Sequence, residues 1–147
     1  VIIVGALIAR RKEAIFTYPG GCDIGSRPID LHIKAFEKLG IDVKEEYGYI
    51  KCSANEIVGA DIGLDFPSVG ATENIMLASI FAKGTTRIIN AAMEPEIVDL
   101  QNALNSMGAK ISGAGTNNII IKGVEKLEQD TLIMPLSENT VLIEAER

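Results

Sequence analysis

The chain has 147 residues and a formal net charge of −6, with 47% hydrophobic and 23% charged residues. This size and composition are typical of one globular domain with a sizeable core, and the acidic balance argues against a nucleic-acid-binding surface or a basic patch for an anionic membrane. One histidine and two cysteines far apart in sequence exclude multi-histidine metal sites and a disulfide framework, and they indicate a reducing, cytoplasmic setting.

The chain begins with an apolar run, Val1 to Ala9, which is followed by Arg10-Arg11-Lys12. A signal peptide carries its positive charge before the apolar run, and this run is too short to span a bilayer. We predict a buried helix, or the C-terminal part of one. The abrupt start without an initiator methionine suggests that the chain is a fragment.

Hydrophobic periodicity and turn residues predict the remaining elements. The expected helices are 28–39, 94–107 and one that starts in the turn at 67–71 and runs to about residue 82. The last of these is apolar nearly all round, so it should be buried on most sides. The expected strands are 13–18, 41–46, 49–54, 60–66, 85–91, 110–112 and 118–122.

The order helix-strand-helix-Gly-strand-turn-strand occurs twice, ending at Cys52 and again at Lys122. The first copy is longer by about five residues, and these can be placed only in the loop that precedes its second helix. A repeat that is elaborated at one loop points to function at that loop.

That loop contains the residues best suited to chemistry. Gly20, Gly21 and Gly25 give the backbone freedom near a ligand. Cys22 is a soft nucleophile whose thiolate is favoured by nearby positive charge, and Arg27 is a planar fork suited to phosphate or carboxylate. The alternative interpretation is a surface loop whose cysteine packs as a small hydrophobe.

These motifs resemble a known family. Pro-Gly-Gly-Cys-x-Ile-Gly-x-Arg-Pro-x-Asp-Leu-His at 19–32 is similar to the catalytic loop of the UDP-N-acetylglucosamine enolpyruvyl (1-carboxyvinyl) transferases. The segments 68–74, 94–100 and 107–116 are similar to further signatures of that family. The resemblance runs from Val1 to about Leu127.

The resemblance implies an α+β fold of βαβαββ units, with helices inside and sheets outside, three units to each of two domains. This chain would hold about one and two-thirds units of one domain, within 1–127. Residues 1–54 would form an incomplete first unit and 60–123 a second. The tail, 128–147, departs from the family pattern, carries an expected strand at 141–145 and suggests truncated or rearranged segments.

The implied reaction passes the enolpyruvyl group of phosphoenolpyruvate to the 3-hydroxyl of UDP-N-acetylglucosamine and releases phosphate. It is the first committed step of peptidoglycan synthesis and hence of cell-wall formation. The implied partners are these two small molecules and the second domain of the same enzyme, with no cofactor, metal, nucleic acid or membrane. We expect the isolated chain to be inactive, because the active site lies between two domains.

The resemblance also implies roles for individual residues. Cys22 would act as general acid on phosphoenolpyruvate and as the target of fosfomycin, and Arg27 would hold the phosphate of phosphoenolpyruvate. The residues expected to line the uridine are Pro28, Ile29, Asp30 and Leu31, and those expected to hold the diphosphate at a helix N-terminus are Ser68, Val69 and Gly70.

Simpler interpretations stand beside these roles. Asp30 suits the first turn of any helix, and Ser68 suits an N-cap, which can coexist with ligand binding. His32 is expected to pack in its helix, and Cys52 in its strand. At the level of the whole chain, the alternatives are a non-catalytic ligand-binding or structural module of the same fold and, more distantly, a related enzyme acting on shikimate phosphate.

Overall fold

The computed structural model describes residues 4–17 and 29–127. The helices are α1 (Val4–Arg11), α2 (Ile29–Lys38), α3 (Val69–Ala78) and α4 (Pro95–Ser106). The strands are β1 (Glu13–Thr17), β2 (Asp42–Glu46), β3 (Tyr49–Ser53), β4 (Asp61–Gly63), β5 (Thr85–Ile89), β6 (Lys110–Ser112) and β7 (Asn118–Lys122). In the described ranges, no helix has the length and apolar character needed to cross a membrane.

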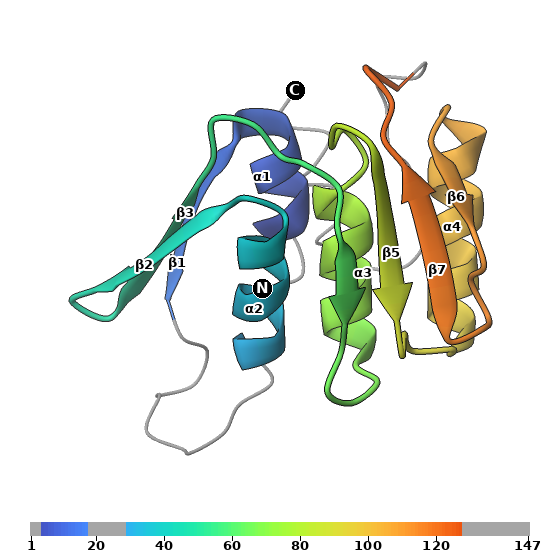
Figure 1. Ribbon diagram of the computed structural model, residues 1–147, viewed down its shortest axis with the longest axis horizontal. Helices are drawn as coiled ribbons and strands as arrows, with labels where there is room; N and C mark the ends of the chain where they lie inside the picture. Colours follow the sequence, from blue (N-terminus) through green and yellow to red (C-terminus); the bar gives the residue numbers. More distant parts are fainter. Residues whose placement is uncertain (1–3, 18–28, 128–147) are drawn as a thin grey trace.

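The strands form two sheets with a shared topology (Figure 1). In the first sheet, of order β1-β3-β2, β3 pairs antiparallel with both neighbours. In the second, of order β4-β5-β7-β6, β7 pairs antiparallel with β5 and β6, and β4 is added in parallel beside β5. Strands β1 and β5, which follow α1 and α3, each pair with the last strand of the hairpin in their sheet, β3 and β7 respectively.

Helices α1, α2 and α3 lie between the two sheets, and α4 lies against the second sheet beside β6 (Figure 1). Helix α3 contacts α1, α2 and α4, and all of its residues from Ala71 to Ala78 are buried. The prediction of a helix buried on most sides is therefore confirmed. Helices α2, α3 and α4 run in the same direction, so their N-termini gather at the lower end of the molecule in Figure 1.

Three elements end two or more residues earlier than their sequence patterns indicate. Helix α3 ends at Ala78, and the chain continues in a tighter turn in which the Ala82 N–H donates to the Ser79 carbonyl at 3.1 Å. Strand β5 ends at Ile89 because Asn90 adopts a positive φ of 67° and its side chain donates to the Leu64 carbonyl. Strand β4 is limited to 61–63, before the chain turns toward α3. The strand expected at 141–145 lies outside the described residues.

Helix α1 packs closely on α3 at Gly5. The Gly5 N–H donates to Asn74 Oδ1 at 2.8 Å, and a Cβ atom at this position would run into the Asn74 backbone carbonyl. The helices can approach this closely only because residue 5 has no side chain. Gly63 offers a contrast, because nothing lies within 4 Å of a Cβ added there.

We predict that Gly5→Ala destabilises the protein by about 1–3 kcal/mol, because separating α1 from α3 outweighs the gain in helix propensity. The measurement is urea unfolding followed by circular dichroism. Gly63→Ala is the matched control and should leave the free energy of unfolding unchanged or slightly higher. Equal stability of the two variants would contradict the close contact between α1 and α3.

Candidate functional site

The sequence-predicted site residues fall on two helix starts and on a segment beyond the described residues. Cys22, Arg27 and Pro28 lie outside the described ranges. Residues 29–31 open α2, and residues 68–70 open α3. The structure brings these two helix starts together, because they lie at the same end of neighbouring parallel helices (Figure 1).

Ser68 is the N-cap of α3, as expected. Its Oγ accepts from the Ala71 N–H at 3.2 Å, and its carbonyl accepts from the Thr72 N–H at 3.0 Å. Within the described part of the chain, the N–H groups of Val69 and Gly70 have no acceptor. Two free amides at the positive end of a ten-residue helix can bind an anion.

The first residues of α2 differ in exposure. Asp30 is exposed, whereas Leu31 is only 5% exposed and belongs to the core. The Leu31 side chain is therefore committed to packing, and a ligand at this helix start could meet its backbone but not its side chain. Asp30 stays available to donors from a ligand.

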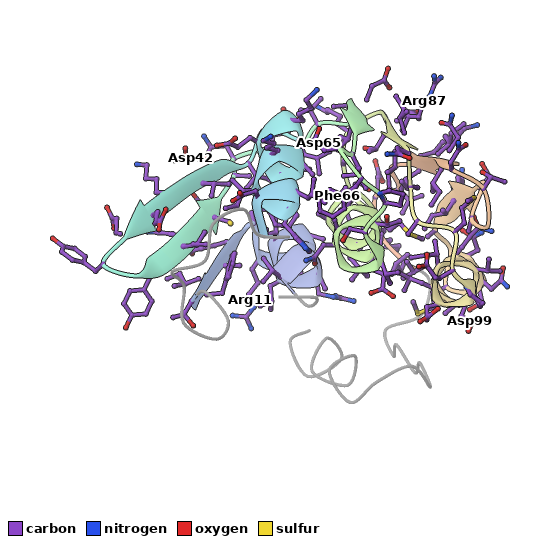
Figure 2. All side chains as sticks on the ribbon, turned by 90° about the horizontal axis from the view of Figure 1, so that it is seen from below. Arg11, Asp42, Asp65, Phe66, Arg87 and Asp99 are labelled. Carbon is purple, nitrogen blue, oxygen red and sulfur yellow. The ribbon has the colours of Figure 1, made fainter. Side chains whose placement is uncertain are left out.

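A cation and an aromatic ring also lie at this end, and the sequence analysis did not single them out. Lys34 Nζ is 3.4 Å from Asp65 Oδ2, which ties α2 to the loop before α3. Both side chains are exposed, so the pair adds little stability. Phe66 follows Asp65 and is 49% exposed; Figure 2 shows it between α2 and α3. No local pattern predicts a contact between segments 31 residues apart.

His32 lies between the two helix starts. It is 6% exposed, and its Nδ1 is 2.9 Å from Nδ2 of Asn74 on α3. Burial lowers the pKa of His32 from its ordinary value of 6.5 to about 4, so the imidazole is neutral at physiological pH. The expectation that His32 packs in its helix is confirmed.

Cys52 is fully buried in β3, which confirms that it packs. Burial raises the pKa of its thiol to about 11, so almost none of it is thiolate at neutral pH. It is therefore unsuited to nucleophilic chemistry. Among the described residues, no group of three histidine, cysteine or acidic side chains could hold a metal ion.

A hollow of about 740 Å³ lies at the other end of the helices. It is lined by the C-terminal end of α1, by the turn after α3 and by the segment that follows β7, with Lys12, Lys83 and Glu125 among its residues. None of the predicted site residues that the structure describes lines it. Those residues lie at the N-termini of α2 and α3, at the opposite end of the helices.

We predict that the His32 imidazole stays neutral in the folded protein down to about pH 4. Because the unfolded chain binds this proton below about pH 6.5, His32 makes folding less favourable as pH falls from 6.5 to 4, by up to about 3 kcal/mol. NMR titration of the imidazole carbon-bound protons measures the pKa directly. In His32→Gln this part of the pH dependence of unfolding should be absent; a folded-state pKa near 6.5 would contradict the prediction.

Comparison with known proteins shows which family this chain resembles. Residues 1–143 match the family described as EPSP synthase (3-phosphoshikimate 1-carboxyvinyltransferase). UDP-N-acetylglucosamine 1-carboxyvinyltransferase 2 of Caldanaerobacter subterraneus subsp. tengcongensis is 63% identical over 127 residues, which are 86% of this chain. UDP-N-acetylglucosamine 1-carboxyvinyltransferase 1 of Carboxydothermus hydrogenoformans is 56% identical over the same share of the chain. The chain spans 30% of the length of each of these relatives.

Solved structures agree in fold. The enolpyruvyl transferase NikO from Streptomyces tendae superposes with a TM-score of 0.67 at 21% identity, over 83% of this chain and 29% of that one. EPSP synthase from Acinetobacter baumannii gives 0.64 at 23% identity, over 86% and 28%. The predicted α+β fold is thus confirmed. Since the family match covers nearly the whole sequence, the chain belongs to the EPSP synthase family of carboxyvinyl (enolpyruvyl) transferases.

Proposed function

We propose that this chain is part of an enzyme that transfers the enolpyruvyl group of phosphoenolpyruvate to the 3-hydroxyl of UDP-N-acetylglucosamine. The observation that carries the proposal is the 63% identity over 127 residues to a protein named for UDP-N-acetylglucosamine carboxyvinyl transfer. The solved EPSP synthase is only 23% identical, which favours the sugar nucleotide over shikimate phosphate as the acceptor.

The element order supports a division into two repeated units. Residues 60–123 run β4-α3-β5-α4-β6-β7, which is a complete βαβαββ unit. Within 1–54, the described elements run α1-β1-α2-β2-β3, which is the same order without an opening strand. We propose that these are one incomplete and one complete unit of the same domain.

The reaction we propose is an addition followed by an elimination. The sugar 3-oxygen bonds to C2 of phosphoenolpyruvate while C3 gains a proton; C3 then loses a proton as the C2–O bond to phosphate breaks. Cys22 would supply the proton to C3, as a thiol tuned by nearby charge can. Arg27 would bind the phosphate through its two-pronged guanidinium. A base for the sugar hydroxyl would come from the second domain, so this chain alone should not turn over.

Both described helix starts fit the sugar nucleotide. The free amides of Val69 and Gly70 suit its diphosphate, and Ser68 shapes the turn that presents them. The start of α2 would contact the uridine through Pro28, Ile29, Asp30 and the Leu31 backbone. By this proposal the enzyme acts in the cytoplasm on the pathway to peptidoglycan, supports cell-wall growth and cell division, and is a target of fosfomycin.

Binding of UDP-N-acetylglucosamine to this chain should be visible at both helix starts. In an amide NMR titration, we expect shift changes to cluster at 29–31 and 68–71, where the two helix N-termini meet, and to leave the hairpin 110–122 unchanged. N-acetylglucosamine alone, which lacks the phosphates, is the control ligand. A folded spectrum without shifts at millimolar sugar nucleotide would contradict a half-site formed by this chain.

The two cysteines should differ in reaction with fosfomycin. The epoxide ring opens on a thiolate and stays attached, so intact mass spectrometry reports one added inhibitor per protein. We expect Cys22→Ala to abolish the adduct. Cys52→Ala is the matched control and should react like the parent chain, because Cys52 is buried and its pKa is raised. Labelling of Cys22→Ala at the rate of the parent chain would remove Cys22 from its proposed role.

A further inference from the structure

Strand β1 has one edge that faces no other described strand. On its paired side, the Ala54 N–H donates to the Lys12 carbonyl at 2.9 Å, and β1 continues in the same antiparallel register on β3. Because bonding alternates along such a ladder, the backbone groups of Glu13, Ile15 and Thr17 point away from β3. In the described part of the chain, β1 is the last strand of its sheet on that side.

The other sheet edges are protected against pairing, as natural edge strands usually are. Strand β2 consists mostly of charged residues, and β4 and β6 have three residues each. Strand β1 has five residues without a proline or a lysine, and Ile15 on its outer face is 59% exposed. An edge with these properties indicates that a partner strand covers it.

The second repeat shows what kind of partner this edge takes. Strand β5 is the counterpart of β1, because each follows a helix and pairs antiparallel with the last strand of a hairpin. On its other side, the Arg87 N–H donates to the Ala60 carbonyl at 3.0 Å, and the Ile89 carbonyl accepts from the Leu64 N–H at 3.0 Å. Strand β4 thus runs parallel to β5 along the side that is open in β1 (Figure 1).

A parallel partner of β1 must enter from the end of the sheet where β1 begins. Lys12, which precedes β1, lines the hollow of about 740 Å³, and so does Ile57, which precedes β4. Leu127, the last described residue, lines the same hollow. The chain beyond Leu127 therefore starts at the correct end, and residues 128–140 can span about 40 Å when extended, which is ample for the crossing.

We propose that residues 141–145 dock on the open edge of β1 as a parallel strand and complete the first sheet. The sequence predicts a strand at these positions, which lie outside the described residues. Addition of an extended segment to a free sheet edge gains main-chain hydrogen bonds along its whole length. The inference is independent of the proposed function, because it concerns the sheet and not the substrates.

The sequence of the segment fits one register on β1. Its alternate positions that would face inward are all apolar, namely Val141, Ile143 and Ala145. They would lie beside buried Ala14 and half-buried Phe16, whereas Glu144 would face solvent. Leu142 would lie opposite Ile15 on the outer face and cover part of its exposed side chain as an apolar cross-strand pair.

This register also fixes the hydrogen bonds. Following the pattern between β4 and β5, the Ile15 N–H would donate to the Val141 carbonyl, and the Ile143 N–H would donate to the Ile15 carbonyl. The N–H of Glu144 would point away from β1. Neighbouring residues of the segment therefore differ in whether their N–H group is needed.

Amide hydrogen exchange of the full chain measures whether the edge is paired. We expect the Ile15 N–H to exchange more slowly than a free amide by roughly tenfold or more, and to stay protected on dilution. Nuclear Overhauser contacts between the Ile15 and Leu142 methyl groups should identify the partner. In an isotope-filtered experiment on mixed labelled and unlabelled protein these contacts should be absent, because both residues belong to one molecule.

Two proline substitutions in the full chain test the direction of bonding. Ile143→Pro removes the N–H that would donate to Ile15, and it should lower the protection of the Ile15 amide by roughly tenfold or more. The Ala14 amide, which bonds to β3, should stay protected and report an intact fold. Glu144→Pro is the matched control, because proline is tolerated where the N–H of an edge strand faces solvent, and it should leave Ile15 protected.

The outcomes decide between this occupant and others. Fast exchange at Ile15 while Ala14 is protected would overturn the docking. Protection lost on dilution, or contacts between labelled and unlabelled molecules, would assign the edge to a second copy of the chain and would also overturn it. Contacts from Ile15 to a different segment, or equal protection of Ile15 in both proline variants, would reject residues 141–145 as the partner strand.

Discussion

The structure depends on how its central helix satisfies the polar groups that it buries. Helix α3 is enclosed by α1, α2 and α4, so a polar side chain on it must find a partner among its neighbours. Asn74 bonds to the Gly5 N–H on one side and to His32 on the other. Thr72 Oγ1 accepts from the Ala92 N–H, in the segment that leads into α4. Thr72 and Asn74 thus tie this mostly apolar helix to α1, to α2 and to the segment that leads into α4.

This arrangement explains why the candidate site lies where it does. The shared sheet order makes α2, α3 and α4 run in the same direction, so their N-termini form one positively polarised end (Figures 1 and 2). The chain carries a net charge of −6, so we expect anion binding to come from backbone amides and a few placed cations. Ser68 caps only part of the α3 terminus, and this leaves two amides for a ligand.

Local patterns predicted most of the elements, because the spacing of hydrophobic residues that marks a helix or a strand involves only neighbouring residues. The hairpin 110–122 was predicted with its observed bounds, and the cap at Ser68 was also correct. Element ends were missed where the backbone leaves the regular pattern, as in the turn after Ala78 and at Asn90, whose positive φ ends β5. The pairs His32–Asn74 and Lys34–Asp65 could not be predicted, because each joins segments more than 30 residues apart. The roles of Cys22 and Arg27 stay predictions.

The central position of α3 also affects how the molecule unfolds. By sequence α3 belongs to the second repeat, yet it is packed against α1 and α2 of the first, and the buried side chains of both repeats form one cluster. Each repeat uses the other to complete its hydrophobic core. Loss of either repeat would expose the core of the other. The two copies therefore form a single cooperative folding unit and unfold together, although the sequence divides them into two repeats.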